Sequence, residues 1–293
     1  MRSLLFVPGD SERKLEKGFS AGADVVIVDL EDSVAAENKV EARRIAADFI
    51  RGRQRAPDAG AIYVRINDLS TGLADDDLSA LVGAKPDGIM LPKSNGGADV
   101  QQLSVKLRVH EAENGLPDGG IAIIPIITET ANGLLSAASY VDASSRLAGM
   151  TWGAEDLSAA IGARSARDDG GRYTDVFRLA RAMTILGASA ANVAAIDTVF
   201  VDFRDMDGLR AECLDAERDG FTGKMAIHPA QVPFINEAFT PSPEAVAQAK
   251  AVVAAFQVAG NPGVVGLDGR MYDRPHLRRA ERLLMRAKNA GVI

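Results

Sequence analysis

The sequence is poor in the residues that many metal and redox sites use. It has one cysteine, Cys213, and three histidines among 293 residues. A single cysteine excludes an internal disulfide and any metal site built from several cysteines. The histidines, His110, His228 and His276, lie far apart and form no H-x-x-x-H pair. The chain therefore lacks the pattern of a zinc hydrolase.

The chain also lacks an excess of positive charge and a long hydrophobic run. Its formal net charge is −7, which argues against general affinity for nucleic acid or anionic membrane surfaces. Its apolar runs are much shorter than the ~20 residues that a membrane-spanning helix needs. The first residues, Met1-Arg2-Ser3, lead directly into a predicted strand without a signal-peptide pattern. We expect a cytoplasmic protein with no nucleic acid and no membrane partner.

What the chain does contain is a series of short apolar runs. They are too short for ordinary helices and too continuous for strands with one wet face, so they are typical of parallel strands buried on both faces. Segments with helical periodicity lie between most of them. We predict strands over residues 3–7, 25–30, 62–66, 88–91, 121–127, 147–152, 198–201 and 224–227. We predict helices over residues 12–21, 39–52, 99–113, 132–138, 174–190 and 209–219.

Repeated alternation of strand and helix predicts an α/β fold with a parallel sheet. Eight such units in a chain of this length favour a closed (β/α)8 barrel, or TIM barrel, which typically takes about 250 residues. The alternative is an open, doubly wound sheet. Against it, the first predicted strand is followed by PGDSERK and not by a G-x-G-x-x-G fingerprint.

A proline-containing stretch, Thr240-Pro241-Ser242-Pro243, marks a predicted boundary. We expect a TIM-barrel catalytic domain over residues 1–239 and a C-terminal helical appendage over residues 240–293. The pattern of the appendage predicts a helix over residues 244–259, a loop over residues 260–268, and a last helix from Arg274 to about Ala290. We expect the appendage to extend the barrel rather than to form a separate core.

Polar residues stand where the predicted strands end, which is the edge where barrel enzymes hold their active sites. Glu129 follows the fifth strand, and Glu155 and Asp156 follow the sixth. Glu129 and Asp156 form a pair of oxygen ligands suited to Mg²⁺, which usually takes one or two protein carboxylates. The alternative is that these acids are helix N-caps or solvated loop charges. Other polar residues at strand ends are Asp29, Glu31, Asp32, Arg65, Asn67, Lys93, Asp202 and His228.

Arg65, at the end of the third predicted strand, has two interpretations. Its guanidinium can form a structural ion pair with Asp29 or Glu31, or it can bind a substrate carboxylate in the bidentate manner that its planar fork allows. A metal beside such an arginine suits a 2-oxo or 2-hydroxy acid. Arg13 and Lys17 stand near the start of the first predicted helix, a location that favours phosphate groups, although a solvated helix face is the alternative.

Motifs in order along nearly the whole chain resemble one known family. They are RSLLFVPGDSERKLEKGFSAGADVVIVDLEDSV, YVRIN, IMLPK, ITET, WGAEDL, KMAIHPAQV and DGRMYDRPHLRRAERLL. The sequence resembles the citrate lyase β-subunit-like family of the HpcH/HpaI aldolase superfamily. The resemblance implies a magnesium-dependent TIM barrel that cleaves or forms the carbon–carbon bond of 3-hydroxyacyl thioesters, with coenzyme A (CoA) as part of the substrate.

The resemblance also implies roles for individual residues. The acids of the ITET-like and GAEDL-like motifs bind the metal, which assigns Glu129 and Asp156. The arginine of the VRIN-like motif binds the substrate acid group, which assigns Arg65. An arginine and a lysine after the first strand contact the CoA portion, and Arg13 and Lys17 match them.

The C-terminal motif M-V-D-x-P of the family reads Met271-Tyr272-Asp273-Arg274-Pro275, with tyrosine in place of valine. In similar enzymes this aspartate reaches the site of a neighbouring subunit and exchanges a proton with the thioester enolate. Asp273 takes that role by resemblance, whereas the sequence alone predicts a helix N-cap. The implied assembly is a homotrimer or hexamer in which the appendage packs on a neighbouring subunit.

These pieces predict a mechanism. Loss of the hydroxyl proton breaks the carbon–carbon bond and gives a 2-oxo acid and a thioester enolate. Backbone N–H groups near Gly153 and Ala154 stabilise the enolate oxygen, and Asp273 protonates its carbon. Glu31, Asp32 or a metal-bound hydroxide takes the hydroxyl proton.

Two other functions remain open. The same residues suit hydrolysis of a malyl-CoA-type thioester, in which water completes the turnover. The chain can also be a carrier-dependent β subunit of a citrate lyase complex. Substrates of malyl, methylmalyl, citramalyl and citryl type are all compatible with the sequence.

Overall fold

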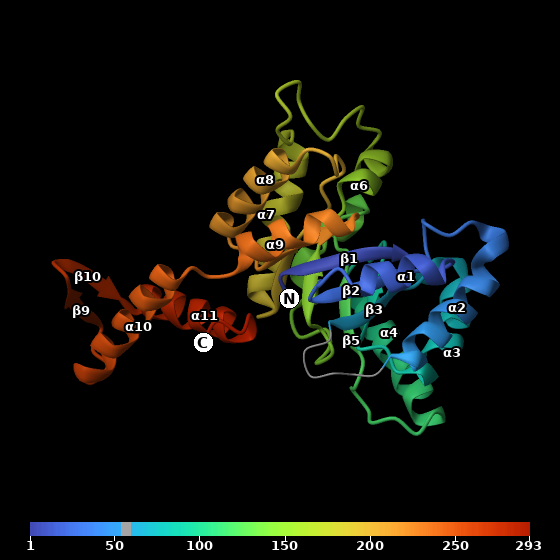
Figure 1. Ribbon diagram of the computed structural model, residues 1–293, viewed down its shortest axis with the longest axis horizontal. Helices are drawn as coiled ribbons and strands as arrows, with labels where there is room; N and C mark the ends of the chain where they lie inside the picture. Colours follow the sequence, from blue (N-terminus) through green and yellow to red (C-terminus); the bar gives the residue numbers. More distant parts are fainter. Residues whose placement is uncertain (54–59) are drawn as a thin grey trace.

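The computed structural model describes residues 1–53 and 60–293 (Figure 1). Its centre is a sheet of eight parallel strands in the order β5-β4-β3-β2-β1-β8-β7-β6. Bridges from Ile123 to Leu147 and from Ile126 to Thr151 join β5 to β6 and close the barrel. The strands are β1 (Ser3–Pro8), β2 (Val25–Asp29), β3 (Ala61–Arg65), β4 (Gly88–Leu91), β5 (Ala122–Pro125), β6 (Gly149–Thr151), β7 (Ala194–Asp197) and β8 (Gly223–Ala226). The predicted TIM barrel is confirmed.

Helices follow the strands and surround the sheet, as Figure 1 shows. They are α1 (Glu12–Phe19), α2 (Lys39–Gly52), α3 (Leu73–Leu81), α4 (Gly97–Glu113), α5 (Ala131–Leu135), α6 (Ala154–Ile161), α7 (Asp175–Ala190), α8 (Met206–Asp219) and α9 (Val232–Phe239). No helix among residues 1–53 and 60–293 is long and apolar enough to cross a membrane.

The strands are apolar on both faces because each face meets a different hydrophobic layer. One buried cluster draws its side chains from the strands or the residues beside them, and from no helix, so it fills the inside of the barrel: Leu4, Val25, Ile27, Tyr63, Met90, Ile124, Ile126, Ile196 and Met225. The alternate residues, such as Leu5, Val26 and Val64, join a larger cluster with helix residues such as Leu15 and Leu78. This double burial produces the continuous apolar runs of the sequence.

The seventh strand was predicted at the wrong place. The prediction was residues 198–201, but β7 runs over Ala194–Asp197 and pairs with β6 and β8. Ile196 fills the barrel interior, whereas the side chain of Val201 is 53% exposed. The β-branched and aromatic run Thr198–Val201 has the stronger strand composition, but tertiary pairing selects the alanines. The acid that ends this strand is therefore Asp197, and Asp202 lies in an exposed loop.

Residues 243–289 form an arm that extends from the barrel in Figure 1. It contains α10 (Pro243–Val258), an antiparallel hairpin of β9 (Val264–Leu267) and β10 (Arg270–Asp273), and α11 (Arg274–Asn289). The hairpin replaces much of the predicted loop, and its turn is an Asp268-Gly269 pair with positive φ at both residues, a known hairpin signal. The arm has its own small hydrophobic cluster around Phe256, so the expectation that it forms no separate core is wrong.

Candidate active site

Lys93 links four of the strand-end acids, one of which is Asp32, whose Oδ2 lies 3.7 Å from the Lys93 ammonium. Lys93 follows β4, and its backbone N–H donates to Glu129 Oε2 at 2.6 Å. Its ammonium forms a direct ion pair with Glu31 and lies 3.3 Å from Asp156 Oδ1. Lys93 adopts φ +49°, a left-handed conformation that is costly for a residue with a side chain. The surrounding fold thus maintains a strained residue at the point where the acids meet.

Glu129 is the most perturbed acid of this group. Its side chain is 4% exposed. Burial, followed by the negative charge of Asp156, raises the pKa of Glu129 to about 8, although the N–H of Lys93 acts in the opposite direction. A Cβ atom on Gly153 would lie 2.9 Å from Glu129 Cγ, so only glycine fits beside this carboxyl group. Glu129 is therefore held in a tight, dry position close to another acid.

Arg65 is held by the acids of β2. Its Nε and Nη2 donate to the two carboxylate oxygens of Asp29, both at 2.7 Å, and its Nη1 lies 3.0 Å from Glu31 Oε2. Burial acts to lower the pKa of the guanidinium, but the hydrogen bonds and charge of Asp29 outweigh it and raise that pKa. The structural ion pair that the sequence left open is present, and it occupies the bidentate edge of Arg65. The Nη1 side remains the edge nearest to Glu31 and the other acids.

A second layer fixes the loops that carry these residues. Lys39 Nζ donates to the backbone oxygens of Leu30 and Glu31 at 2.6 and 2.7 Å and to Asn67 Oδ1 at 2.8 Å. Buried Asp77 accepts hydrogen bonds from both the backbone and the side chain of Asn67 at 2.7 Å. The loops after β2 and β3 are thereby joined, which sets Glu31 beside Arg65.

The backbone N–H groups of Gly153 and Ala154, the donors expected near α6, differ in their hydrogen-bond partners. The N–H of Gly153 donates to the hydroxyl of buried Thr128 at 3.2 Å. Ala154 begins α6, and the first N–H groups of a helix have no partner within the helix. The N–H of Ala154 is therefore the better placed of the two to meet an oxygen anion.

Glu129 and Asp156 suit a hard cation that takes only one or two of its ligands from the protein. Among the residues that the structure describes, no group of three or more His, Cys, Asp or Glu side chains is arranged to hold a metal ion. Glu129 and Asp156 offer two carboxylates, and burial, followed by the charge of Asp156, raises the pKa of Glu129, which a cation beside the two acids would counteract. This donor set suits Mg²⁺, which keeps several waters and takes one or two protein carboxylates.

Other predicted site residues are not brought to this cluster. Arg13 and Lys17 are exposed and lie four residues apart on α1, on one face of the helix. Asp273 caps the N-terminus of α11 and ends β10, which lies at the outer end of the arm in Figure 1, apart from the barrel. The N-cap that the sequence alone predicted is present.

Comparison with known proteins decides the family. Residues 2–229 match the HpcH/HpaI aldolase/citrate lyase family. The chain belongs to this family. The (3S)-malyl-CoA thioesterase of Cereibacter sphaeroides (strain ATCC 17025) is 36% identical, with 98% of this chain and 94% of that protein aligned. The mitochondrial citramalyl-CoA lyase of Rattus norvegicus is also 36% identical, over 97% of this chain and 85% of that protein.

A solved member of the HpcH/HpaI family has the same architecture. The crystal structure of CitE from Mycobacterium tuberculosis in complex with magnesium, acetoacetate and coenzyme A matches with a TM-score of 0.77 and 36% identity, over 98% of this chain and all of that one. The resemblance seen in the sequence is therefore confirmed. The family match ends at residue 229, but the individual relatives align with nearly the whole chain, so they share the arm as well.

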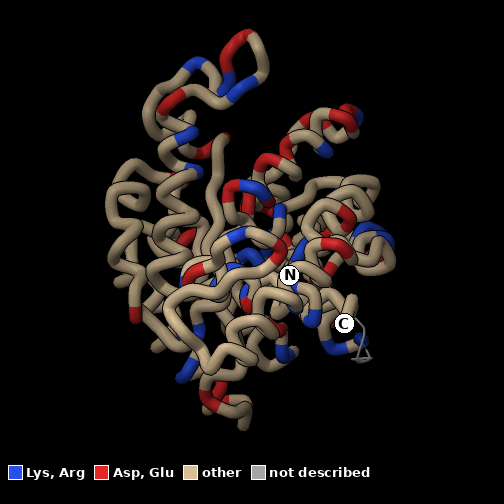
Figure 2. Tube along the Cα trace, turned by 90° about the vertical axis from the view of Figure 1, so that its left-hand side faces the viewer, with Lys and Arg blue, Asp and Glu red and all other residues tan. Residues whose placement is uncertain are grey.

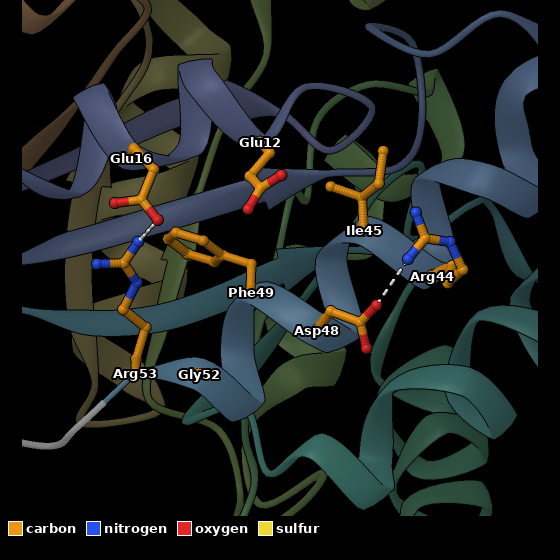
Figure 3. A pocket seen from close by; sticks show the side chains of 8 residues that line it. All are labelled: Glu12, Glu16, Arg44, Ile45, Asp48, Phe49, Gly52 and Arg53. Carbon is orange, nitrogen blue, oxygen red and sulfur yellow. Dashed lines mark hydrogen bonds and ion pairs between the residues drawn. The ribbon is translucent and has the colours of Figure 1, made fainter.

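A cavity in the described part of this HpcH/HpaI family member lies away from the acids. It has a volume of about 310 Å³ and lies between α1 and α2 (Figure 3). Its walls carry two internal ion pairs, Arg53 with Glu16 and Arg44 with Asp48. None of the strand-end acids lines it. In Figure 2 acidic and basic positions are interspersed along the visible trace.

Lys93 is the residue that the sequence interpretation undervalued. Its place after the fourth strand was noted, but it was not included among the candidate site residues. The signal was its position in IMLPK at the end of a strand, because a lysine at the edge where several acids meet can form ion pairs with them.

Proposed function

We propose that this protein is a magnesium-dependent carbon–carbon lyase that cleaves or forms a 3-hydroxyacyl-CoA thioester of malyl, citramalyl or citryl type. The observation that carries the proposal is the buried carboxyl group of Glu129, which accepts a hydrogen bond from the Lys93 N–H at 2.6 Å and whose pKa is raised to about 8 by burial and by the charge of Asp156. Such a pair needs a cation to be fully ionised near neutral pH. The related citramalyl-CoA lyase and the CitE complex with magnesium and coenzyme A support the same reading.

Glu129 and Asp156 are the proposed magnesium ligands. When bound, magnesium supplies Lewis-acid chemistry, which lowers the pKa of a substrate hydroxyl and offsets the charge of a substrate carboxylate. Lys93 fixes Glu129 through its backbone N–H and approaches Asp156 with its ammonium. Gly153 leaves the space that the Glu129 side chain occupies.

Arg65 and Glu31 are proposed to act on the substrate itself. Arg65 is oriented by Asp29 and offers its Nη1 edge to the substrate acid group. Glu31 Oε2 lies 3.0 Å from that Nη1 but receives no well-formed hydrogen bond within the described part of the chain. Burial raises the pKa of Glu31. This oxygen is the proposed acceptor of the hydroxyl proton as the carbon–carbon bond breaks.

The products of that step are a 2-oxo acid and a thioester enolate. The backbone N–H of Ala154, at the start of α6 beside Gly153, is proposed to donate to the enolate oxygen. Asp273 is proposed to give a proton to the enolate carbon, or to remove one in the direction of condensation. Arg13 and Lys17 are proposed to contact the phosphates of CoA from the exposed face of α1.

The proposed role of Asp273 requires a second copy of the chain. Asp273 ends β10, which lies on the arm and apart from the barrel in Figure 1. The arm also exposes large apolar side chains, including Val258 at 90% and Met271 at 78%. We propose a closed assembly, a homotrimer or hexamer, in which the arm packs on a neighbouring subunit and brings Asp273 to its site. Light scattering that finds a fully active monomer would refute this assembly.

A thioesterase is the second candidate, because a (3S)-malyl-CoA thioesterase is among the relatives. One assay separates the two. The purified protein is incubated with Mg²⁺ and malyl-, β-methylmalyl-, citramalyl- or citryl-CoA, while 2-oxo acid and free thiol are both followed. Oxo acid without thiol establishes the lyase and names its substrate, and thiol release establishes the thioesterase. Absence of activity on all four would favour a carrier-dependent β subunit instead.

A further inference from the structure

The helix α6 carries two groups of the proposed site but has a small apolar face of its own. Ala154 begins it with the N–H that is proposed to meet the enolate oxygen, and Asp156 lies in its first turn. Of its eight residues, Ala154 and Leu157 are the buried ones. A short helix depends on tertiary contacts to keep its position. Contacts that can do this lie in the segments immediately before and after α6.

A closed ring of side-chain contacts connects these two segments. Its members are Trp152, Asp197, Lys224, Glu212, Arg167 and Tyr173. We call this group the α6 clamp. Trp152 immediately precedes Gly153, the N-cap of α6, whereas Arg167 and Tyr173 lie in the loop between α6 and α7 and pair through an isolated antiparallel bridge. The other three members come from β7, β8 and α8. Both ends of α6 therefore lead into the same group.

Polar contacts form one side of the ring. Trp152 Nε1 donates to Asp197 Oδ1 at 2.8 Å. Lys224 Nζ donates to Asp197 Oδ2 at 2.8 Å and to Glu212 Oε1 at 2.7 Å. Arg167 Nη2 donates to the second carboxylate oxygen of Glu212 at 2.6 Å. A continuous chain of hydrogen bonds thus runs from the residue before the N-cap of α6 to the loop after the helix.

Aromatic contacts complete the ring. The central guanidinium carbon of Arg167 lies 3.8 Å from the centre of the Tyr173 ring, a cation–π contact. The Tyr173 ring meets the ring of Trp152 edge to face, with centroids 5.1 Å apart and an interplanar angle of 66°. Each member of the α6 clamp therefore contacts two others, and loss of one member opens the ring.

The centre of the α6 clamp is inaccessible to water. Trp152, Asp197 and Lys224 are fully buried. Burial acts to lower the pKa of Lys224, but the charges of Asp197 and Glu212 outweigh it and raise that pKa. Arg181 adds a positive charge 3.7 Å from Asp197. A buried ion pair is often no more stabilising than apolar side chains of the same volume, so stability alone does not explain it. A satisfied polar network does, however, fix the orientation of its members.

The position of Trp152 matters because the next residue meets a proposed magnesium ligand. A Cβ atom on Gly153 would lie 2.9 Å from Glu129 Cγ, so this backbone and the Glu129 side chain are in close contact. Asp156 follows three residues later in the first turn of α6. A displacement of ~1 Å that begins away from the reacting atoms can lower a rate by ~10²-fold. Movement of Trp152 or α6 would therefore disturb both carboxylates.

We propose that the α6 clamp acts as one unit that fixes α6, so that Asp156 and the N–H of Ala154 keep their places beside Glu129. Asp197 and Arg167 are then positioning residues, which act through Trp152 and through the loop after α6. This inference rests on the proposed function.

The variant Arg167→Met opens the ring at a partly exposed member. The Arg167 side chain is 29% exposed, and its replacement leaves the buried pair of Lys224 and Asp197 in place, so the variant should fold. Arg172→Met is the matched control. Arg172 belongs to the same loop, its side chain is 85% exposed, and it pairs with Asp168 at 3.4 Å.

Magnesium affinity is the first readout, measured by calorimetry on the purified chain without substrate. We expect the dissociation constant for Mg²⁺ to rise by ~10-fold in Arg167→Met, and kcat for carbon–carbon cleavage to fall by a similar factor. Arg172→Met should keep the wild-type values. A purely structural role would lower the stability of Arg167→Met in urea and leave the Mg²⁺ affinity of the folded protein unchanged. An Arg167→Met protein with the Mg²⁺ affinity and kcat of Arg172→Met overturns the proposal.

The fluorescence of Trp152 is the second readout, because the sequence contains one tryptophan. Acrylamide quenches an indole by collision, so a buried ring is quenched weakly. We expect stronger quenching in Arg167→Met than in the wild type or in Arg172→Met. Equal quenching in all three proteins would mean that the ring does not hold Trp152, and it overturns the proposal.

The variant Trp152→Phe tests whether the α6 clamp acts as one unit. Phenylalanine keeps an aromatic ring beside Tyr173 but cannot donate to Asp197. Because each substitution opens the same ring, the double variant with Arg167→Met should bind Mg²⁺ little more weakly than the weaker of the two single variants. Additive losses overturn the unit. If the wild type cleaves none of the four thioesters, the proposed lyase fails, and the Mg²⁺ affinities and the quenching still decide the role of the α6 clamp.

Discussion

Glu129 should make the metal-free protein less stable as the pH rises. The pKa of its carboxyl group is about 8 in the folded chain against an ordinary value of 4.5. The folded state therefore binds more protons than the unfolded state between these values, so the free energy of unfolding falls as pH rises through this window. Each unit of difference corresponds to 1.36 kcal/mol, so the full effect approaches about 5 kcal/mol, with a slope of about 1.4 kcal/mol per pH unit.

The variant Glu129→Gln isolates this contribution, because the amide keeps the shape and an acceptor for the Lys93 N–H but does not ionise. Urea unfolding is measured in a chelator from pH 5 to pH 8.5. We expect the free energy of unfolding of the variant, relative to that of the wild type, to increase by about 2 to 3 kcal/mol between pH 6 and pH 8. Glu155→Gln, next to Asp156 but exposed, is the control and should show no such gain.

Magnesium should make the wild type more stable than Glu129→Gln at pH 8. A cation that binds only the folded wild type stabilises it by mass action and leaves Glu129→Gln almost unaffected. The free energies of unfolding of the wild type and Glu129→Gln could instead change in parallel over the whole pH range in chelator. In that case burial and Asp156 do not raise the pKa of the Glu129 carboxyl group. The argument for the metal site from Glu129 would then be lost.

Three further changes test other parts of the structure. Asp156→Asn should raise the Mg²⁺ concentration for half-maximal activity by ~10-fold or more, and an unchanged requirement would remove Asp156 from the metal site. Arg65→Lys cannot reproduce the bidentate contact with Asp29, so kcat/KM in the lyase assay should fall by ~10²-fold; a near-normal value would contradict its role. Lys224→Met removes the buried ammonium that pairs with Asp197 and Glu212, and leaves Asp197 only its contacts with Trp152 and Arg181. The free energy of unfolding in urea should fall by about 3 kcal/mol, whereas an unchanged value would mean that the buried pair contributes little.

The fold could be predicted because the barrel imposes a simple pattern on the chain. Strands buried on both faces produce short apolar runs, and the carboxyl ends of parallel strands meet at one edge. Glu129, Asp156 and Arg65 could therefore be selected from their positions alone. The predicted runs at residues 3–7 and 88–91 lie close to β1 and β4 for this reason.

The sequence was less informative where tertiary contacts decide. Residues 198–201 have better strand composition than β7, but only the register with β6 and β8 places Ile196 inside the barrel. The left-handed backbone of Lys93 and its contacts with Glu129 and Glu31 depend on three separate loops.

The charges of the site explain why its parts depend on one another. Five carboxylates lie in the ion-paired group that includes Arg65 and Lys93: Asp29, Glu31, Asp32, Glu129 and Asp156. If all were ionised, these two cations would leave three negative charges, and a substrate with its own carboxylate would add another. Burial, followed by the charge of Asp156, raises the pKa of Glu129 and so favours a proton on one of these acids. A divalent cation removes the same excess without a proton, and this is why ionisation of Glu129, metal binding and acceptance of an acidic substrate are coupled events in the proposed reaction.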